Sequence, residues 1–205
     1  MLSSNDFNSS LAFSLDQFKK HDLVKADSID LMNRVDSKFL FRLSELPKIL
    51  EECVSSYSAL QMLKTCVFAY KNTYFDFPDY HLYLSHHNKK LNRNKVRFRT
   101  YPKTETKFLE VKTKTNKGRT VKARIKIPIE NKVIGEENSI FIAEQGITNP
   151  KTLVPMQMCN YKRISLMDYG ASERLTFDFH LHYNCRYENS NCLLYTSDAA
   201  DDQLG

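Results

Sequence analysis

Basic side chains are concentrated between residues 89 and 126 of this 205-residue sequence. The segment holds 15 of the chain's 30 lysines and arginines and only two carboxylates, Glu105 and Glu110, so its net charge is +13. The other residues must sum to −7, because the whole chain carries +6. A cationic segment of this density predicts a binding site for a polyanion.

The spacing of these charges indicates how they are presented. Charged and apolar residues alternate at 95–99 (KVRFR), 109–114 (LEVKTK) and 121–127 (VKARIKI). Each pattern predicts a strand with one charged and one apolar face. Two interpretations remain open: the charged faces converge on one anion site, or each is an ordinary solvated face. Convergence requires a multivalent anion, since two like charges 4 Å apart cost roughly 4 kcal/mol at an effective dielectric near 20.

The rest of the sequence predicts the elements that position these strands. Apolar spacing predicts a helix over 11–33 and a second over 44–55, with a short strand at 37–42 between them. Further strands are expected at 64–74, 81–85, 95–101, 106–115, 120–128, 160–166 and 174–181, with a helical insertion within 129–158. Many antiparallel strands with a few helices predict an α+β fold, in which a closed or nearly closed barrel would bring the charged faces together.

Composition limits the class of protein. At 205 residues and 41% hydrophobic, the chain is expected to bury one core as a single domain. No apolar run approaches the roughly 20 residues that cross a bilayer, and the first residues lack the pattern of a secretory signal. The five cysteines are scattered without a C-x-x-C pair, so a zinc site is not expected and a cytoplasmic location fits best.

Seven short motifs occur in the order found in one known family. They are 34–39 (RVDSKF), 73–76 (TYFD), 97–101 (RFRTY), 108–112 (FLEVK), 122–124 (KAR), 161–163 (YKR) and 173–178 (ERLTFD). In this order the sequence resembles the VTC domain, the polyphosphate polymerase domain of vacuolar transporter chaperone proteins, in a form similar to the stand-alone bacterial members. The resemblance spans about residues 30 to 182.

The resemblance implies a triphosphate tunnel of the CYTH-like type, an antiparallel barrel with flanking helices and a basic lumen. It implies binding of a nucleoside triphosphate, expected to be ATP, and of polyphosphate. It also implies transfer of the γ-phosphoryl group to the polyphosphate chain with a divalent metal, Mn²⁺ or Mg²⁺. Partner proteins are not indicated.

The resemblance also implies site residues. Catalytic roles fall on Arg97, Arg99 and Lys112. The phosphate-binding side chains would be Lys38, Arg97, Arg99, Lys112, Lys122, Arg124, Arg163 and Arg174. Glu110 and Asp36 would orient the basic side chains or help to hold the metal, whose main glutamate is expected in a later strand. Arg34 stands where more distant tunnel enzymes carry the first glutamate of an E-x-E-x-K strand, which argues against a simple triphosphatase.

The end of the sequence departs from the family. Residues 192–205, beginning CLLYTSDAAD, resemble the translated read-through of a sequencing adaptor. We therefore expect an N-terminal helical segment at 1–30, a tunnel domain at 31–191 that lacks its C-terminal part, and a non-native tail at 192–205. On this interpretation the fragment is inactive and the intact parent is the enzyme.

Other functions remain in competition with the polymerase. The same tunnel would also suit hydrolysis of triphosphate or short polyphosphate, or a non-catalytic module that binds polyphosphate. Nucleic-acid binding is permitted by the charge but is disfavoured, because single-strand binders place aromatic platforms beside their basic residues. Between Lys95 and Arg99 the charged face carries only charged residues, and Phe98 lies opposite.

Overall fold

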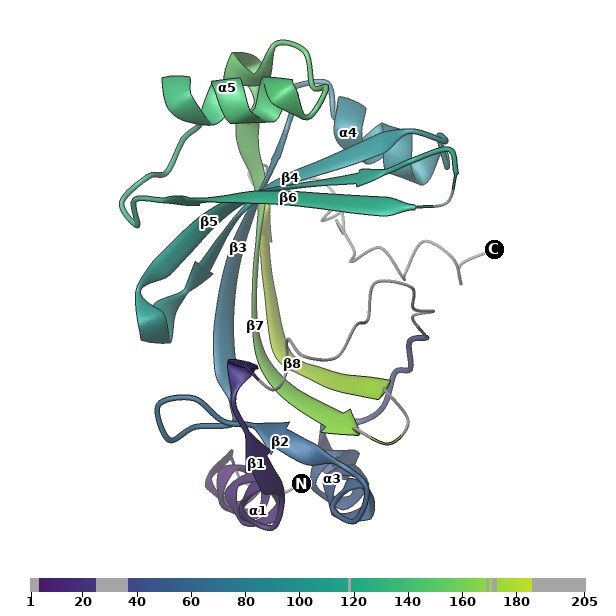
Figure 1. Ribbon diagram of the computed structural model, residues 1–205, viewed down its shortest axis with the longest axis vertical. Coiled ribbons are helices and arrows are strands. Elements are labelled where there is room, and N and C mark those ends of the chain that lie inside the picture. The colour runs from purple at the N-terminus through teal and green to yellow at the C-terminus, as the bar shows by residue number, and fades with distance from the viewer. Residues whose placement is uncertain (1–3, 25–36, 118, 169, 171–172, 186–205) are drawn as a thin grey trace. The chain divides into compact units, whose positions relative to one another are not determined.

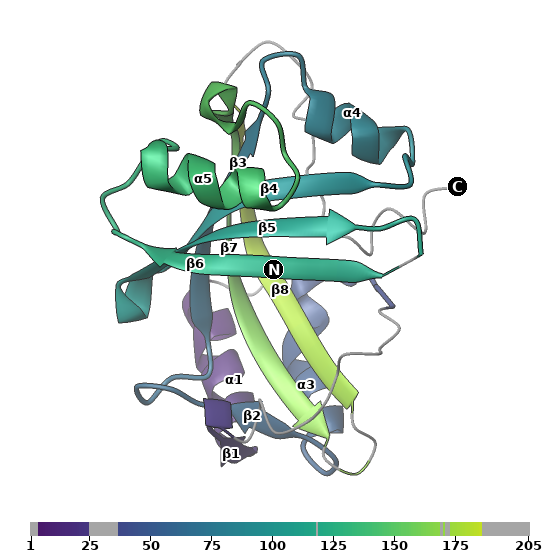
Figure 2. The same cartoon turned by 45° about the horizontal axis from the view of Figure 1, so that its top comes forward.

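The computed structural model describes residues 4–24, 37–117, 119–168, 170 and 173–185 as strands with a few helices (Figures 1 and 2). The strands are β1 (Lys19–His21), β2 (Ser58–Leu60), β3 (Phe68–Asp76), β4 (Arg93–Tyr101), β5 (Thr106–Lys114), β6 (Thr120–Ile127), β7 (Val154–Asp168) and β8 (Glu173–Cys185). The α-helices are α1 (Ser4–Asp16), α3 (Leu46–Cys53), α4 (His81–His87) and α5 (Glu136–Glu144). The 3-10 turns are η1 (Leu43–Glu45), η2 (Pro102–Thr104) and η3 (Pro150–Thr152).

The strands follow the order β1-β2-β7-β3-β4-β5-β6, and β8 pairs with β7 off this path. The pair β1–β2 is parallel, whereas β2–β7, β3–β4, β4–β5 and β5–β6 are antiparallel. The predicted α+β class with a mainly antiparallel sheet is therefore confirmed. In the described part of the chain the sheet is an open path rather than a closed ring of strands, and β6 ends that path beside β5.

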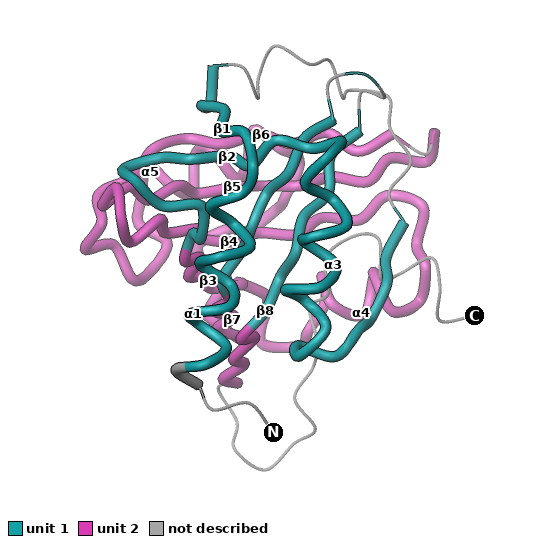
Figure 3. Tube along the Cα trace, turned by 90° about the horizontal axis from the view of Figure 1, so that it is seen from below, with its two compact units in different colours: residues 1–68, 162–179 teal, residues 69–161, 180–205 magenta. Residues whose placement is uncertain are grey.

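The chain divides into two compact units, residues 1–68 with 162–179, and residues 69–161 with 180–205 (Figure 3). The core of the first unit joins α1 and α3 to the parts of β7 and β8 that belong to it. Its most buried side chains include Leu46, Leu50, Ile164 and Leu166, each 0% exposed. Burial of aliphatic side chains of this size stabilises a fold by about 1.5–3 kcal/mol each, so this core holds the unit's helices on its strands.

The second unit buries the apolar face of β3 to β6. Phe75 and Phe98 meet edge to face at a centroid distance of 4.5 Å, and Leu109 and Val111 continue this apolar surface on β5. Helices α4 and α5 lie on the same side of these strands in both views (Figures 1 and 2), and α5 contributes Ile142 to the same core. The opposite face of β4 to β6 is therefore the one that carries the charged residues.

Asp76, the last residue of β3, accepts hydrogen bonds from the first turn of helix α4. Its buried carboxylate accepts the backbone N–H groups of Phe77 and Leu82 at Oδ1 and that of Tyr83 at Oδ2, at 2.7 to 2.8 Å. The first N–H groups of a helix have no partner within the helix, so a carboxylate at this point satisfies them. Asp76 therefore has a structural role that explains its place in the 73–76 motif.

Three predicted elements differ from the structure. The helix expected at 11–33 begins earlier and ends at Asp16, because the chain then extends as β1 to pair with β2. Residues 37–42 form no strand. Residues 81–85 belong to helix α4 rather than to a strand. Residues 25–36 and 186–205, which include Asp36 and the proposed read-through tail, lie outside the described part of the chain.

Candidate functional site

The strand register of the second unit places the charged residues of β4, β5 and β6 side by side. Arg97 pairs with Glu110, which pairs with Arg124, and Lys95 pairs with Lys112, which pairs with Lys122. Directly paired residues of antiparallel strands project from the same face of the sheet. The three charged faces therefore lie side by side on one face of the sheet, and binding of an anion there stays a prediction. We call this surface the basic face; it comprises Lys95, Arg97, Arg99, Glu110, Lys112, Lys122 and Arg124.

Glu110 is the carboxylate at the centre of the basic face and is only 2% exposed. Its Oε2 lies 2.7 Å from Nη2 of Arg97 and accepts a hydrogen bond from Nε of the same side chain at 2.8 Å. Arg99 Nε lies 4.0 Å from Oε2, and Lys122 Nζ lies 3.3 Å from Oε1. Oε1 forms an ion pair with Lys122 but accepts no hydrogen bond of regular geometry from the described residues. A single carboxylate thus orders three cations.

These charges shift the titration of the groups that meet at Glu110. Burial raises the pKa of Glu110, but the positive charges of Arg97, Arg99 and Lys122 outweigh burial and lower the pKa to about 2. Partial burial lowers the pKa of Lys122, and the charge of Glu110 opposes that shift without cancelling it. Glu110 is therefore ionised at neutral pH and serves as the counter-ion of the basic face.

Arg99 is fixed by partners on two neighbouring strands. Its Nε donates to Oδ1 of Asn72 on β3 at 2.9 Å, and its Nη2 donates to the hydroxyl of Tyr161 on β7 at 3.2 Å. Asn72 is 2% exposed and donates its own Nδ2 to the backbone carbonyl of Cys159 at 2.9 Å. The amide of Asn72 is thereby oriented with its oxygen toward Arg99. Asn72 is uncharged and lies outside the seven motifs, so the sequence pattern did not point to it.

Aromatic rings also lie on the charged side of these strands. Tyr70 stacks on Tyr161 with a centroid distance of 5.1 Å, and Tyr101 meets Tyr70 edge to face at 5.2 Å. Phe108, which pairs directly with Arg99, meets Tyr101 at 5.9 Å. The expectation of an exclusively charged face holds within β4 between residues 95 and 99, but neighbouring positions supply rings beside the cations.

Three predicted phosphate-binding residues belong to the first unit. Arg163 on β7 forms a bidentate pair with Asp178 on β8, with Nε–Oδ1 and Nη2–Oδ2 distances of 2.6 Å. Arg174 is exposed on β8, and Lys38 is half-buried outside regular secondary structure. The remaining basic residues of the prediction lie on the basic face of the second unit, whereas Asp36 is outside the described residues.

The carboxylates of the described residues do not fit a divalent metal. Among the residues that the structure describes, no group of three histidine, cysteine, aspartate or glutamate side chains could hold an ion. Both oxygens of Glu110 already face Arg97 or Lys122. Mg²⁺ and Mn²⁺ prefer several oxygen ligands, and cations at this distance compete with a metal for the single carboxylate.

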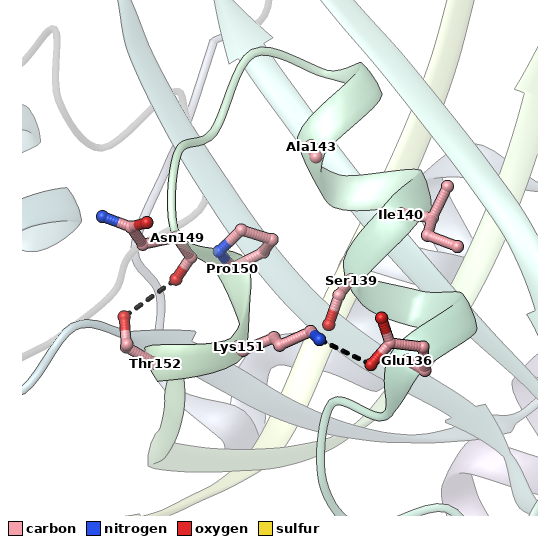
Figure 4. A pocket seen from close by; sticks show the side chains of 8 residues that line it. All are labelled: Glu136, Ser139, Ile140, Ala143, Asn149, Pro150, Lys151 and Thr152. Atoms are coloured by element: carbon pink, nitrogen blue, oxygen red, sulfur yellow. Dashed lines mark hydrogen bonds and ion pairs between the residues drawn. The ribbon is translucent and has the colours of Figure 1, made fainter.

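A separate pocket of about 370 Å³ lies between α5 and η3 (Figure 4). An ion pair between Lys151 Nζ and Glu136 Oε2, at 2.6 Å, crosses its rim. The pocket contains none of the predicted site residues. Its lining consists of Glu136, Ser139, Ile140, Ala143, Asn149, Pro150, Lys151 and Thr152.

The curated proteins and the solved structures do not identify a family for this chain. A search of curated proteins found no match. One solved structure that matches is a protein from Vibrio parahaemolyticus described as a candidate adenylate cyclase, with 13% identity and a TM-score of 0.35; the alignment covers 55% of this chain and 51% of that protein. The chain thus spans about half of that protein's length, and a TM-score this low does not establish a shared fold.

Most of the sequence matches one family model. No helix in the described ranges is long and apolar enough to cross a membrane. The family model of the VTC domain matches residues 33–202, which is most of the sequence. The motifs fall in the expected order along β3 to β8, and the chain belongs to the VTC domain family.

Proposed function

We propose that this protein is a polyphosphate polymerase-type domain that binds a nucleoside triphosphate and polyphosphate along the basic face and transfers the γ-phosphoryl group to the polyphosphate chain. The observation that carries the proposal is the pair of cross-strand rows, Arg97–Glu110–Arg124 and Lys95–Lys112–Lys122. Membership of the VTC domain family supports the same conclusion.

The charge balance of the basic face favours a polyanion as ligand. Six basic side chains gather there around one carboxylate, and three of them form the lysine row. Like charges directly opposite one another on a sheet are destabilising. A chain of phosphates presents a negative charge at each repeat, so one ligand would neutralise the basic side chains of both rows.

Phosphoryl transfer asks a protein mainly for positioning and for charge stabilisation. In the proposed reaction a terminal oxygen of the polyphosphate bonds to the γ-phosphorus, the bond from that phosphorus to the β–γ bridging oxygen breaks, and the nucleoside diphosphate leaves with that oxygen. Arg97 and Arg99 would stabilise the charge on the transferred group through planar N–H donors, and Lys112 would act as a compact point charge. No protein nucleophile is needed.

A divalent metal would neutralise the triphosphate in this chemistry. Because the described carboxylates do not fit one, we propose that its ligands lie outside the described residues, where Asp36 is one candidate. The basic face would also suit a second candidate function, a module that binds polyphosphate without catalysis.

Incubation of the 205-residue protein and of the protein encoded by the parent DNA with ATP and Mn²⁺ tests the proposal, with polyphosphate followed on a gel and free phosphate measured in parallel. Polymer made by the parent and lost in an Arg97→Ala, Arg99→Ala double variant would support polymerase activity at the basic face. Lys151→Ala, at the pocket of Figure 4, is the matched control.

Each other outcome has a definite meaning. Phosphate release without polymer would replace the polymerase by a hydrolase. Tight polyphosphate binding with neither product would leave the binding module. A protein that binds neither ATP nor polyphosphate would overturn the assignment of the basic face.

A further inference from the structure

The rings beside Arg99 form a small aromatic surface, which we call the ring patch: Tyr70, Tyr101, Phe108 and Tyr161. Each of these four side chains is partly exposed rather than buried. Tyr70, Tyr101 and Phe108 belong to none of the three apolar clusters of the described residues. Their partial exposure on the charged side of the sheet therefore calls for an explanation other than core packing.

The ring patch adjoins the cations directly. The guanidinium carbon of Arg99 lies 5.3 Å from the ring centroid of Tyr70, and that of Arg124 lies 5.0 Å from the centroid of Phe108. Phe108 is also the direct cross-strand partner of Arg99. Sites that bind single-stranded nucleic acid combine aromatic rings, on which bases stack, with neighbouring basic side chains that hold the phosphates.

The order of residues along β4 fits a ligand with an aromatic end and an anionic end. Tyr101, Arg99 and Arg97 project from one face at steps of two residues, which is about 7 Å in an extended strand. A planar group resting against Tyr101 and Phe108 would direct an attached phosphate chain along Arg99 and then toward Arg97. Inorganic polyphosphate has no group that would use the rings.

We infer that the ring patch is a nucleobase-binding subsite, in which the base of a nucleoside triphosphate stacks while its phosphates lie on the basic face. The inference rests on the proposed function, since it requires the basic face to bind phosphates. It adds a means of selecting the donor: the protein distinguishes a nucleoside triphosphate from inorganic triphosphate by the ring patch.

Calorimetric titration of the full chain with ATP and with inorganic tripolyphosphate, at one ionic strength, separates the two contributions. Loss of a stacking ring typically weakens binding of a base by roughly 5- to 150-fold. We expect Tyr101→Leu to weaken ATP binding by about tenfold or more and to leave the affinity for tripolyphosphate within twofold. Tyr101→Phe, which keeps the ring, should restore ATP binding, and Phe13→Leu on α1, where Phe13 is 68% exposed, is the control.

The titrations contain the results that overturn the inference. If Tyr101→Leu weakens ATP and tripolyphosphate equally, the rings serve only to hold Arg99. If neither affinity changes, the base does not contact the ring patch. Wild-type protein that binds neither ligand would overturn the proposed function itself. Phe108→Leu provides the same comparison if circular dichroism shows that Tyr101→Leu does not fold.

Discussion

Oε2 of Glu110 lies 2.8 Å from Nε and 2.7 Å from Nη2 of Arg97, across the β4–β5 pair. Both donors converge on one carboxylate oxygen, which leaves the other oxygen facing Lys122 at 3.3 Å. Arg97 also donates through Nη1 to the hydroxyl of Tyr74 at 3.1 Å. The guanidinium is thus oriented from two strands before any ligand arrives, and preorganised donors of this kind cost little reorganisation during a reaction.

Glu110 is expected to contribute a pH-dependent share of the stability. Its pKa in the folded protein is about 2, below the ordinary value of 4.5. A lowered folded-state pKa contributes stability that is fully present above the unfolded value and is lost as the pH falls toward 2. The shift corresponds to about 3 kcal/mol. The free energy of unfolding measured in urea should therefore fall more steeply from pH 5 to pH 3 in wild type than in Glu110→Gln.

The control for this prediction is Glu144→Gln, which changes an exposed carboxylate on α5. Its unfolding curve should keep the wild-type dependence on pH. Parallel pH profiles for wild type and Glu110→Gln would show that the carboxylate does not form the ion pairs described here.

Asn72→Ala should destabilise the protein by about 1–3 kcal/mol, because it leaves a buried donor of Arg99 and the carbonyl of Cys159 without their partners. It should also weaken polyphosphate binding by several-fold, since Arg99 loses its fixed orientation. Chemical unfolding and calorimetric titration measure the two effects. Asn131→Ala, which removes an amide away from the basic face, should change neither stability nor binding. Unaltered stability in Asn72→Ala would contradict a stabilising role for the hydrogen bonds between Asn72, Arg99 and Cys159.

The lysine row predicts that the ligand stabilises the fold. Lys95, Lys112 and Lys122 lie opposite one another on three strands, and such like charges are destabilising. Polyphosphate should therefore raise the melting temperature, in proportion to its binding. Lys112→Gln should gain less from polyphosphate than wild type does, because the variant carries one positive charge fewer in the lysine row. A thermal scan with and without polyphosphate tests both points; an equal gain in the variant would exclude Lys112 from the site.

The C-terminal sequence provides a prediction about the gene. If residues 192–205 are adaptor read-through, the parent DNA should diverge from the present sequence after about residue 191 and encode a further strand with a lumen-facing glutamate. The family match extends to residue 202, which lies within the proposed read-through. The parent reading frame therefore decides whether residues 192–205 are native. An unbroken reading frame through residue 205 would make these residues native.

The basic face was predictable from the sequence because its signal is local. Alternation of charged and apolar residues predicted strands at 95–101, 106–115 and 120–128, and β4, β5 and β6 agree with these bounds to within two residues. Short windows were less informative. Residues 81–85 are helical because Asp76 caps the segment and because Leu82, Ser85 and His86 have helical spacing on a buried side.

The sequence pattern could not predict contacts between distant segments. Strand β1 has three residues and exists through its parallel pairing with β2, which no local periodicity reveals. Asn72 and Tyr161 meet Arg99 across sequence separations of 27 and 62 residues. Their positions depend on strand order and register, which the sequence pattern did not supply.

The basic residues of β6 have a consequence for the solubility of the protein. In the described part of the sheet β6 is a terminal strand, and a terminal strand can pair with the sheet of another molecule. Lys122, Arg124 and Lys126 oppose such pairing through charge repulsion between molecules. A polyanion that neutralises them removes this protection, so saturating polyphosphate should favour self-association of the same protein whose fold it stabilises.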